Sequence, residues 1–212
     1  MSDSIEVYFS FRSPYSYLAT PGMLRLREDF NVALNLRPVL PIAVRSPDFF
    51  SPENARRVRY IQLDWIRRAE FLGMPSKWPD PDPIVQNLET LEIASEQPLI
   101  YELTALGVEA QRQGKGIEFA KQVSHLIFGG NKDWNQDEKF TVPVKAAGLD
   151  LQQMRASLID GDHRDEIQRN QAALAEAGHW GVPTLVFQGE PFFGQDRIDT
   201  LRWRLDQQGL RK

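Results

Sequence analysis

The chain has 212 residues, of which 42% are hydrophobic and 10% aromatic, and a formal net charge of -4 at pH 7. These values predict a folded protein of one domain or one domain with a large insertion, and they argue against a nucleic-acid binder or a membrane span. With no cysteine and only three histidines, far apart in sequence, we expect neither disulfides nor a metal site.

The chain begins with an acidic segment that enters a strand directly, without the basic start and apolar stretch of a secretory signal, so we expect a cytoplasmic location. Apolar residues alternate from Ile5 to Phe11 and from Val32 to Leu36, which predicts two strands. A helix is expected between them, over 14–30, with Ser13 as its N-cap. Pro21 predicts a kink or an interruption in that helix.

The middle of the chain has helical periodicity. Apolar residues recur every three or four positions from Glu53 to Leu72, with arginines between them, which predicts an amphipathic helix. Three prolines from Trp78 to Pro83 predict an extended loop. Further helices are expected over Asn87–Glu96, Leu99–Gln113, Ile117–Phe128, Asp137–Ala147, where Pro143 argues against continuity, and His163–Ala177.

Strand signals return near the C-terminus. Thr184 to Phe187 and the pair Phe192-Phe193 flank Gly189, which predicts a hairpin. A last helix is expected to begin with Asp196 as its cap. The order is therefore βαβ, a long helical insert, then ββα. We expect one domain formed by residues 1–40 and 178–212, interrupted by a helical insertion domain over residues 41–177.

Three short motifs lie next to these predicted elements. They are Ser13-Pro14-Tyr15-Ser16 at the start of the first helix, Gly181-Val182-Pro183-Thr184 before the third strand, and Phe192 to Arg197 at the end of the fourth strand. With the element order, they resemble the DsbA-like branch of the thioredoxin fold. Within that branch they resemble the kappa-class glutathione transferases and the 2-hydroxychromene-2-carboxylate isomerases. The resemblance covers the whole chain. It implies an α/β thioredoxin-like fold with a large all-helical insertion, and a cis peptide before Pro183.

The first motif lies where redox proteins of this fold carry Cys-x-x-Cys. A helix N-terminus presents free amides and a partial positive charge, which stabilise an anion. The resemblance implies that the anion here is the thiolate of glutathione, with the Ser13 hydroxyl donating a hydrogen bond that lowers the thiol pKa. Ser13 is then the catalytic residue: it stabilises the nucleophile and is not itself the nucleophile.

The other motifs are assigned by the resemblance to the rest of glutathione. Val182 and Pro183 would offer a backbone edge to its cysteinyl part. Arg57 stands where the family has a lysine, and it would face either the second carboxylate of glutathione or an anionic substrate. The family also has an asparagine before that lysine. Asp48 and Asn54 both lie near the corresponding position here, and the sequence does not decide between them. The segment assigned to the γ-glutamyl end comprises Phe193, Gly194, Gln195 and Asp196.

The resemblance implies a glutathione-dependent cis-trans isomerase of the 2-hydroxychromene-2-carboxylate isomerase type. It would act as a homodimer on a small aromatic or unsaturated carboxylate in aromatic compound degradation. In the family's reaction the thiolate adds to a double bond next to a carbonyl, the resulting single bond rotates, and elimination restores the alkene. The alternatives are a kappa-like transferase on another electrophile and a cysteine-free, non-catalytic thioredoxin-like binding protein. Retention of Gln195-Asp196-Arg197 with Ser13 favours the enzyme.

Each of these residues also has a purely structural interpretation. Ser13 before a proline is a common helix start, and Asp196 is also explained as a cap of the last helix. Trp180 is expected in the core more often than in a pocket. Of Tyr15 and Tyr17, one is expected to pack and the other to border the site.

Overall fold

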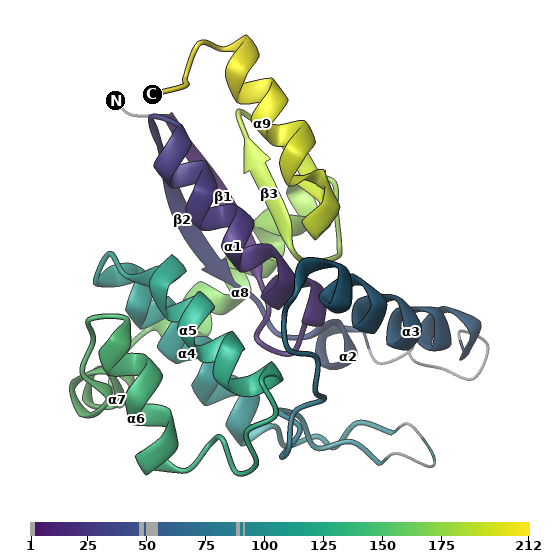
Figure 1. The fold of residues 1–212 in the computed structure, drawn as a ribbon. Coiled ribbons are helices and arrows are strands. Elements are labelled where there is room, and N and C mark those ends of the chain that lie inside the picture. The colour runs from purple at the N-terminus through teal and green to yellow at the C-terminus, as the bar shows by residue number, and fades with distance from the viewer. Residues whose placement is uncertain (1–2, 47–48, 50–54, 88–89, 91) are drawn as a thin grey trace.

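Figure 1 shows the fold as a computed structural model, which describes residues 3–46, 49, 55–87, 90 and 92–212. Four strands form one sheet in the order β2-β1-β3-β4. They are β1 (Asp3–Phe9), β2 (Val32–Pro38), β3 (Thr184–Phe187) and β4 (Glu190–Phe193). β1 is parallel to β2 and antiparallel to β3, and β3 is antiparallel to β4. This sheet confirms the predicted βαβ and ββα units of a thioredoxin-like fold.

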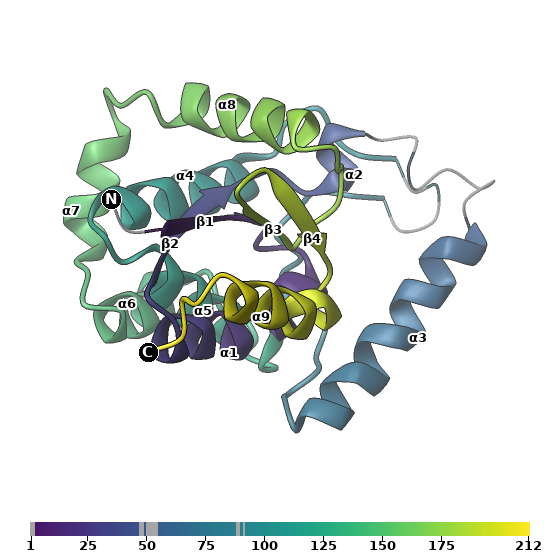
Figure 2. The same cartoon turned by 90° about the horizontal axis from the view of Figure 1, so that it is seen from above.

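The sheet is covered on both faces. In Figure 2, α8 (His163–Glu176) lies on one side of it, and α1 (Pro14–Asp29) and α9 (Ile198–Gln207) lie on the other. Because both faces are covered, consecutive residues of β1 are buried, from Val7 through Phe9. The apolar run that predicted β1 is therefore the centre of the core.

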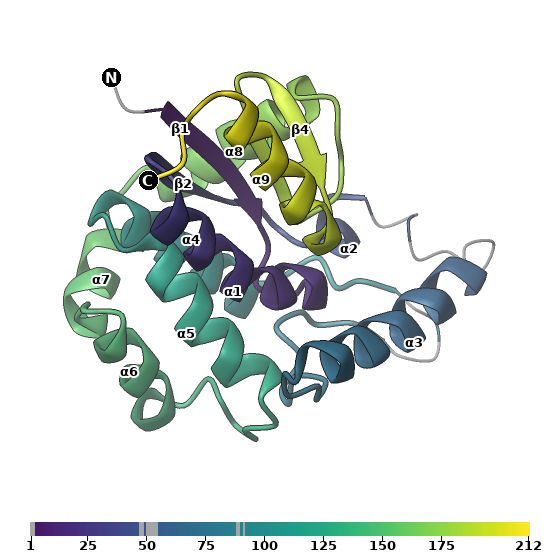
Figure 3. The ribbon, with the colours of Figure 1, turned by 45° about the horizontal axis from the view of Figure 1, so that its top comes forward.

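The segment between β2 and β3 is mainly helical, as predicted. Figure 3 shows α3 projecting from the body of the molecule. None of the helices in the described ranges combines the length and the apolar character needed to cross a bilayer. The helices are α2 (Ile42–Arg45), α3 (Ala55–Leu72), α4 (Pro98–Arg112), α5 (Gly116–Phe128), α6 (Asp137–Ala146), α7 (Leu151–Leu158) and α8.

Helix α1 begins as predicted but is not interrupted. Ser13 is extended, with φ -90° and ψ 113°, and its side chain caps the first turn. Pro21 lies inside the helix and has no amide to donate to the Tyr17 carbonyl. The hydroxyl of Thr20 donates to that carbonyl at 2.8 Å instead. This substitute bond accounts for a helix that runs unbroken through the proline, contrary to the interruption that we considered.

Two other helix predictions differ from the structure. The helix predicted over Asn87–Glu96 is wrong for the described residues of that stretch, where Gln86 and Ile93 form an antiparallel bridge. Helix α6 continues through Pro143, contrary to the doubt that this proline raised. Helix α7 was not predicted, although Asp150 caps it by accepting from the Gln153 amide at 2.8 Å. A short helix with few buried residues has weak apolar periodicity.

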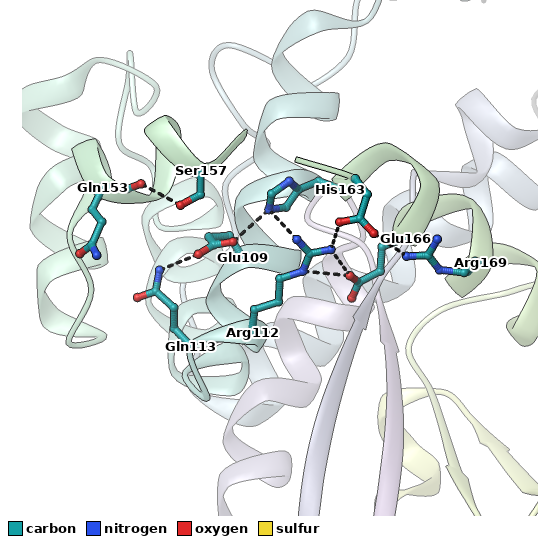
Figure 4. Close-up of polar contacts among 9 residues, drawn as sticks. Glu109, Arg112, Gln113, Gln153, Ser157, His163, Glu166 and Arg169 are labelled. Carbon is teal, nitrogen blue, oxygen red and sulfur yellow. Dashed lines mark hydrogen bonds and ion pairs between the residues drawn. The ribbon is translucent and has the colours of Figure 1, made fainter. Parts of the chain in front are cut away.

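A buried polar cluster connects α8 to α4, as Figure 4 shows. His163 and Glu109 are both buried, and His163 Nε2 lies 3.0 Å from Glu109 Oε2. Burial opposes ionisation of Glu109, but hydrogen bonds from Gln113 and His163 outweigh it and lower the pKa of Glu109. Arg112 adds an ion pair with Glu166. The cluster joins the first turn of α8 to the end of α4, away from the cleft.

Candidate active site

A cleft of about 1010 Å³ is lined by the start of α1, the loop before β3, the turn after β4, and helices α2 and α3. Pro183 is buried next to the cleft but does not line it. The sequence-predicted site residues that line the cleft are Ser13, Arg57, Val182, Phe193, Gly194, Gln195 and Asp196. The fold thus brings together residues that are up to 183 positions apart, from Ser13 to Asp196.

Ser13 connects the helix start to the loop before β3. Its hydroxyl oxygen accepts from the Ser16 amide at 3.2 Å, and the hydroxyl donates to the Val182 carbonyl at 3.3 Å. The second distance is long for a hydrogen bond donated by a hydroxyl. The Tyr15 amide has no partner among the described residues. A free amide, the helix dipole and a weakly engaged hydroxyl therefore converge on one place that suits an anion.

The peptide bond between Val182 and Pro183 is cis, as the resemblance implied. The Pro183 carbonyl accepts from the Gly194 amide at 2.9 Å, which ties this loop to the turn after β4. The Val182 amide has no partner in the described part of the chain. It lines the cleft as a free backbone donor next to the carbonyl that Ser13 contacts.

The turn after β4 depends on Gly194. Its φ is 104°, and a Cβ there would lie 2.6 Å from Asp196 Oδ1. Gln195 Oε1 accepts from Arg68 Nε at 2.9 Å, and Asp196 Oδ2 lies 2.9 Å from Arg197 Nη1. The prediction that Asp196 caps the last helix is wrong. A 3-10 turn at Gln195–Arg197 precedes α9, which has no side-chain cap, so the Asp196 carboxylate stays exposed in the cleft.

The cleft has an excess of positive charge. Arg12 is neutralised by Asp82 at 2.7 Å. In contrast, Arg45, Arg57 and Arg68 have no carboxylate partner within the described ranges. The Arg57 guanidinium carbon lies 5.0 Å from the centre of the Phe49 ring. The neighbouring arginines of its cluster, residues 56 and 59, do not line the cleft, and positions 48 and 54 lie outside the described residues.

The sequence did not single out the pair that joins α1 to α3. Tyr15 lines the cleft, and its hydroxyl donates to Asp64 Oδ2 at 2.7 Å. Burial and this bond raise the pKa of Tyr15 well above its usual range. Burial opposes ionisation of Asp64, but hydrogen bonds from Tyr15 and Arg67 lower its pKa. Tyr17 is buried, so the expected division between the two tyrosines is confirmed.

Aromatic rings form another part of the cleft surface. Trp180 is 52% exposed and lines the cleft, so the expectation that it lies in the core is wrong. His179 stacks on Phe193 with ring centroids 3.9 Å apart, and its Nδ1 accepts from the Gly181 amide at 2.9 Å. Burial lowers the pKa of His179, which favours the neutral ring needed for that bond. His179 therefore shapes the loop, whereas Trp180 forms part of the cleft surface.

The sequence also did not identify a buried serine at the cleft, Ser10. Ser10 lines the cleft and is 1% exposed, yet its hydroxyl has no partner among the described residues. Buried polar groups are usually hydrogen-bonded. An unpaired hydroxyl beneath the start of α1 is consistent with a cleft that takes a polar ligand. No periodicity distinguishes this serine from the apolar residues around it.

Comparisons with known proteins identify the family of this chain. A family model described as "DSBA-like thioredoxin domain" matches residues 4–206. A 2-hydroxychromene-2-carboxylate isomerase of Sphingobium xenophagum is 23% identical over 205 residues, which cover 95% of this chain and 97% of that protein. Glutathione S-transferase kappa 1 of Homo sapiens is 22% identical over 207 residues, covering 93% and 88%.

A solved structure of a 2-hydroxychromene-2-carboxylate isomerase superposes with a TM-score of 0.72 at 18% identity, covering 96% of this chain and 95% of that chain. At such identity the superposition shows a shared fold. The family model spans nearly the whole chain, including α1, the loop before β3 and the turn after β4. The chain therefore belongs to the DSBA-like thioredoxin domain family.

Proposed function

We propose that this protein is a glutathione-dependent cis-trans isomerase of the 2-hydroxychromene-2-carboxylate isomerase type. The observation that carries the proposal is Ser13: a weakly engaged hydroxyl at an open helix N-terminus, beside a cis Val182-Pro183 peptide, in a chain without cysteine. Relatives named as such an isomerase and as a glutathione transferase support the same reading. The reactive sulfur would then come from the ligand.

The residues of the cleft fit glutathione. The free Val182 amide and the Val182 carbonyl would pair with its cysteinyl backbone. The exposed carboxylate of Asp196 would hold the γ-glutamyl ammonium, and Arg68, fixed by Gln195, would hold the carboxylate beside it. Arg57 would take the second carboxylate. When bound, glutathione supplies a thiolate that can add reversibly to an alkene conjugated with a carbonyl.

Ser13 would keep the ligand sulfur ionised. Its hydroxyl has only a long bond to the Val182 carbonyl to give up, and a hydrogen bond to a charged group is worth about 1.5–3 kcal/mol. A position at a helix N-terminus adds about 0.3–1 kcal/mol. Since one pKa unit corresponds to about 1.4 kcal/mol, we expect the bound thiol pKa to lie at least about one unit below that of free glutathione. No redox change is required.

The main alternative is a kappa-like transferase acting on another electrophile. The two named relatives have nearly equal identity to this chain, 23% and 22%, so identity does not separate the two activities. The products do. An isomerase releases glutathione unchanged, whereas a transferase gives a conjugate that mass spectrometry detects. The third reading, a non-catalytic binding protein, predicts a peptide ligand and no affinity for glutathione.

We also propose that the protein is a homodimer, as the resemblance implied, and that it is cytoplasmic. The projecting helix α3 supports an interface between copies because it exposes Leu63, Ile66 and Phe71. Light scattering on the purified protein tests the dimer. Fractionation of cells tests the location.

Calorimetry with reduced glutathione tests the proposal. We expect wild-type protein to bind it, and Asp196→Ala to bind it at least about tenfold more weakly, because the variant leaves the ammonium unpaired. Arg164→Met, which removes an exposed arginine outside the cleft, is the control and should bind normally. Absence of binding at millimolar glutathione would refute the cofactor assignment and favour the binding protein.

A further inference from the structure

Ser10 is a buried residue of the cleft to which the proposed function gives no role. It follows the last residue of β1 and lines the cleft, and only 1% of its surface is exposed. Its hydroxyl has no hydrogen-bond partner in the part of the chain that the structure describes. A buried hydroxyl in this state has lost its hydration without compensation. At the wall of a cleft, a ligand can supply the missing partner.

Ser10 and Ser13 lie on the same tight turn. The Ser13 amide donates to the Ser10 carbonyl, three residues earlier, at 3.0 Å. A turn closed by such a bond brings its two end Cα atoms within about 7 Å of each other. Both side chains line the same cleft. One ligand group at the start of α1 can therefore contact both hydroxyls.

A third serine holds this turn against the helix. The Ser10 amide donates to Ser16 Oγ at 3.4 Å, and the Ser16 amide donates to Ser13 Oγ at 3.2 Å. With the bond from Ser13 to Ser10, these contacts link the three serines in a closed circuit. Ser16 is fully buried and does not line the cleft. Because the circuit fixes the backbone of Ser10 and Ser13, little conformational entropy would be lost when their hydroxyls bind a ligand.

The polar side chains nearest to Ser10 in the sequence are already paired. Arg12 forms its ion pair with Asp82 at 2.7 Å, and the Tyr15 hydroxyl donates to Asp64 at 2.7 Å. The Ser10 hydroxyl thus has a proton to donate and, within the described ranges, no acceptor for it. An anion at the N-terminus of α1 would be such an acceptor, and the helix dipole favours an anion there.

We propose that Ser10 is a second catalytic hydroxyl, which donates a hydrogen bond to the same thiolate as Ser13. This rests on the proposed function, which places the sulfur of glutathione at the start of α1. Each hydrogen bond to the charged form of a group favours that form, and several donors act together. The proton stays on the Ser10 oxygen throughout. Ser13 gives up its bond to the Val182 carbonyl when it binds the sulfur, whereas Ser10 gains its first partner.

The stability of the ligand-free protein distinguishes this role from a structural one. Ser10→Ala should raise the urea midpoint, because it removes a buried hydroxyl that lacks a partner. Ser124→Ala is the matched control. Ser124 is also fully buried, and its hydroxyl also has no partner among the described residues, but it lies on α5 and does not line the cleft. Both variants should raise the midpoint, and only Ser10→Ala should change the properties of the bound ligand.

Two ligands then locate the contact at the sulfur. Glutathione and S-methylglutathione, whose thioether cannot ionise, are titrated by calorimetry at a pH at which the bound thiol is ionised. Ser10→Ala should raise the pKa of the bound thiol by at least about half a unit. It should therefore weaken glutathione by about threefold or more, and leave S-methylglutathione within about twofold of wild type. Ser13→Ala should keep part of the pKa shift, and the double variant with Ser10→Ala should keep less than either single variant.

Three results would overturn the second donor and leave the glutathione assignment intact: a lower urea midpoint in Ser10→Ala, an unchanged thiol pKa in that variant, or an equal loss of affinity for the two ligands. If Ser10→Ala fails to fold, Ser13→Ala decides, since a bound thiol that titrates like free glutathione in that variant leaves no contribution for Ser10. Wild-type protein without affinity for glutathione would refute the proposed function and the second donor together.

Discussion

The two sides of the cleft present different chemistry. One side, which we call the backbone wall, consists of the start of α1, the loop before β3 and the turn after β4. Its features are a helix cap at Ser13, a cis peptide before Pro183 and a positive φ at Gly194. The other side, the arginine wall, consists of α2 and α3 with their long cationic side chains. Residues whose role depends on backbone conformation tolerate few substitutions. A cationic side chain can be replaced by another cation that keeps the charge.

The largest effect should follow a change in the backbone wall at Gly194. Gly194→Ala places a Cβ 2.6 Å from Asp196 Oδ1 at a φ of 104°. We expect a loss of about 1–3 kcal/mol in the free energy of unfolding, and glutathione binding weakened by about tenfold. Urea denaturation and calorimetry measure the two. Gly189→Ala is the control, since its φ is also positive but no atom lies near the new Cβ; equal effects of both variants on binding would contradict a site-specific role.

The buried pair of Glu109 and His163, which joins α4 to α8 away from the cleft, should give a smaller effect that depends on pH. The folded pKa of Glu109 lies below its ordinary value of 4.5, so its contribution to stability is present above pH 4.5 and is lost as the pH falls through the folded value. Glu109→Gln should cost about 1–2 kcal/mol at neutral pH and should flatten this acid-side loss. Denaturation at a series of pH values checks both. The exposed Glu96→Gln should follow wild type, and an unchanged acid limb in Glu109→Gln would count against the pair.

Ser13→Ala should separate the two roles of the cap. Loss of the side-chain acceptor should lower the free energy of unfolding by about 1 kcal/mol. Asp150→Ala, which removes the cap of α7, should cost a similar amount. Only Ser13→Ala should raise the pKa of the bound thiol. If both variants leave that pKa unchanged, Ser13 is a helix cap and no more.

The smallest effect is expected on the arginine wall. Arg57 is exposed and its guanidinium lies over the Phe49 ring. Arg57→Lys keeps the charge, so glutathione affinity should fall by less than about threefold, with Arg57→Met falling further. Calorimetry at two salt concentrations compares them, because added salt should reduce the difference between lysine and methionine. A lysine variant as weak as the methionine variant would mean that planar geometry is what Arg57 supplies.

Most of the backbone wall was predictable from the sequence. The cap at Ser13, the cis peptide before Pro183 and the glycine after β4 are properties of local sequence and of a recognisable family pattern. Asp196 was placed in the site, but its capping role was wrong because a 3-10 turn intervenes before α9. Local rules do not distinguish an α-helical first turn from a 3-10 turn.

The arginine wall was much less predictable. Arg57 was named through the family's lysine, whereas Arg45 and Arg68 owe their place to contacts with Trp180 and Gln195, which lie 135 and 127 residues away. Trp180 was expected in the core for its size alone. Such assignments depend on how the insert folds back over the sheet, and periodicity reports only which residues of a helix are apolar.

The central claim is that the cleft holds a thiolate that the chain itself does not possess. Since the protein has no cysteine, the ultraviolet absorbance of thiolate in its complex with glutathione reports the ligand alone. A pH titration of this absorbance should give a pKa at least about one unit below that of free glutathione, with the shift reduced in Ser13→Ala. A bound thiol that titrates like free glutathione would contradict the account.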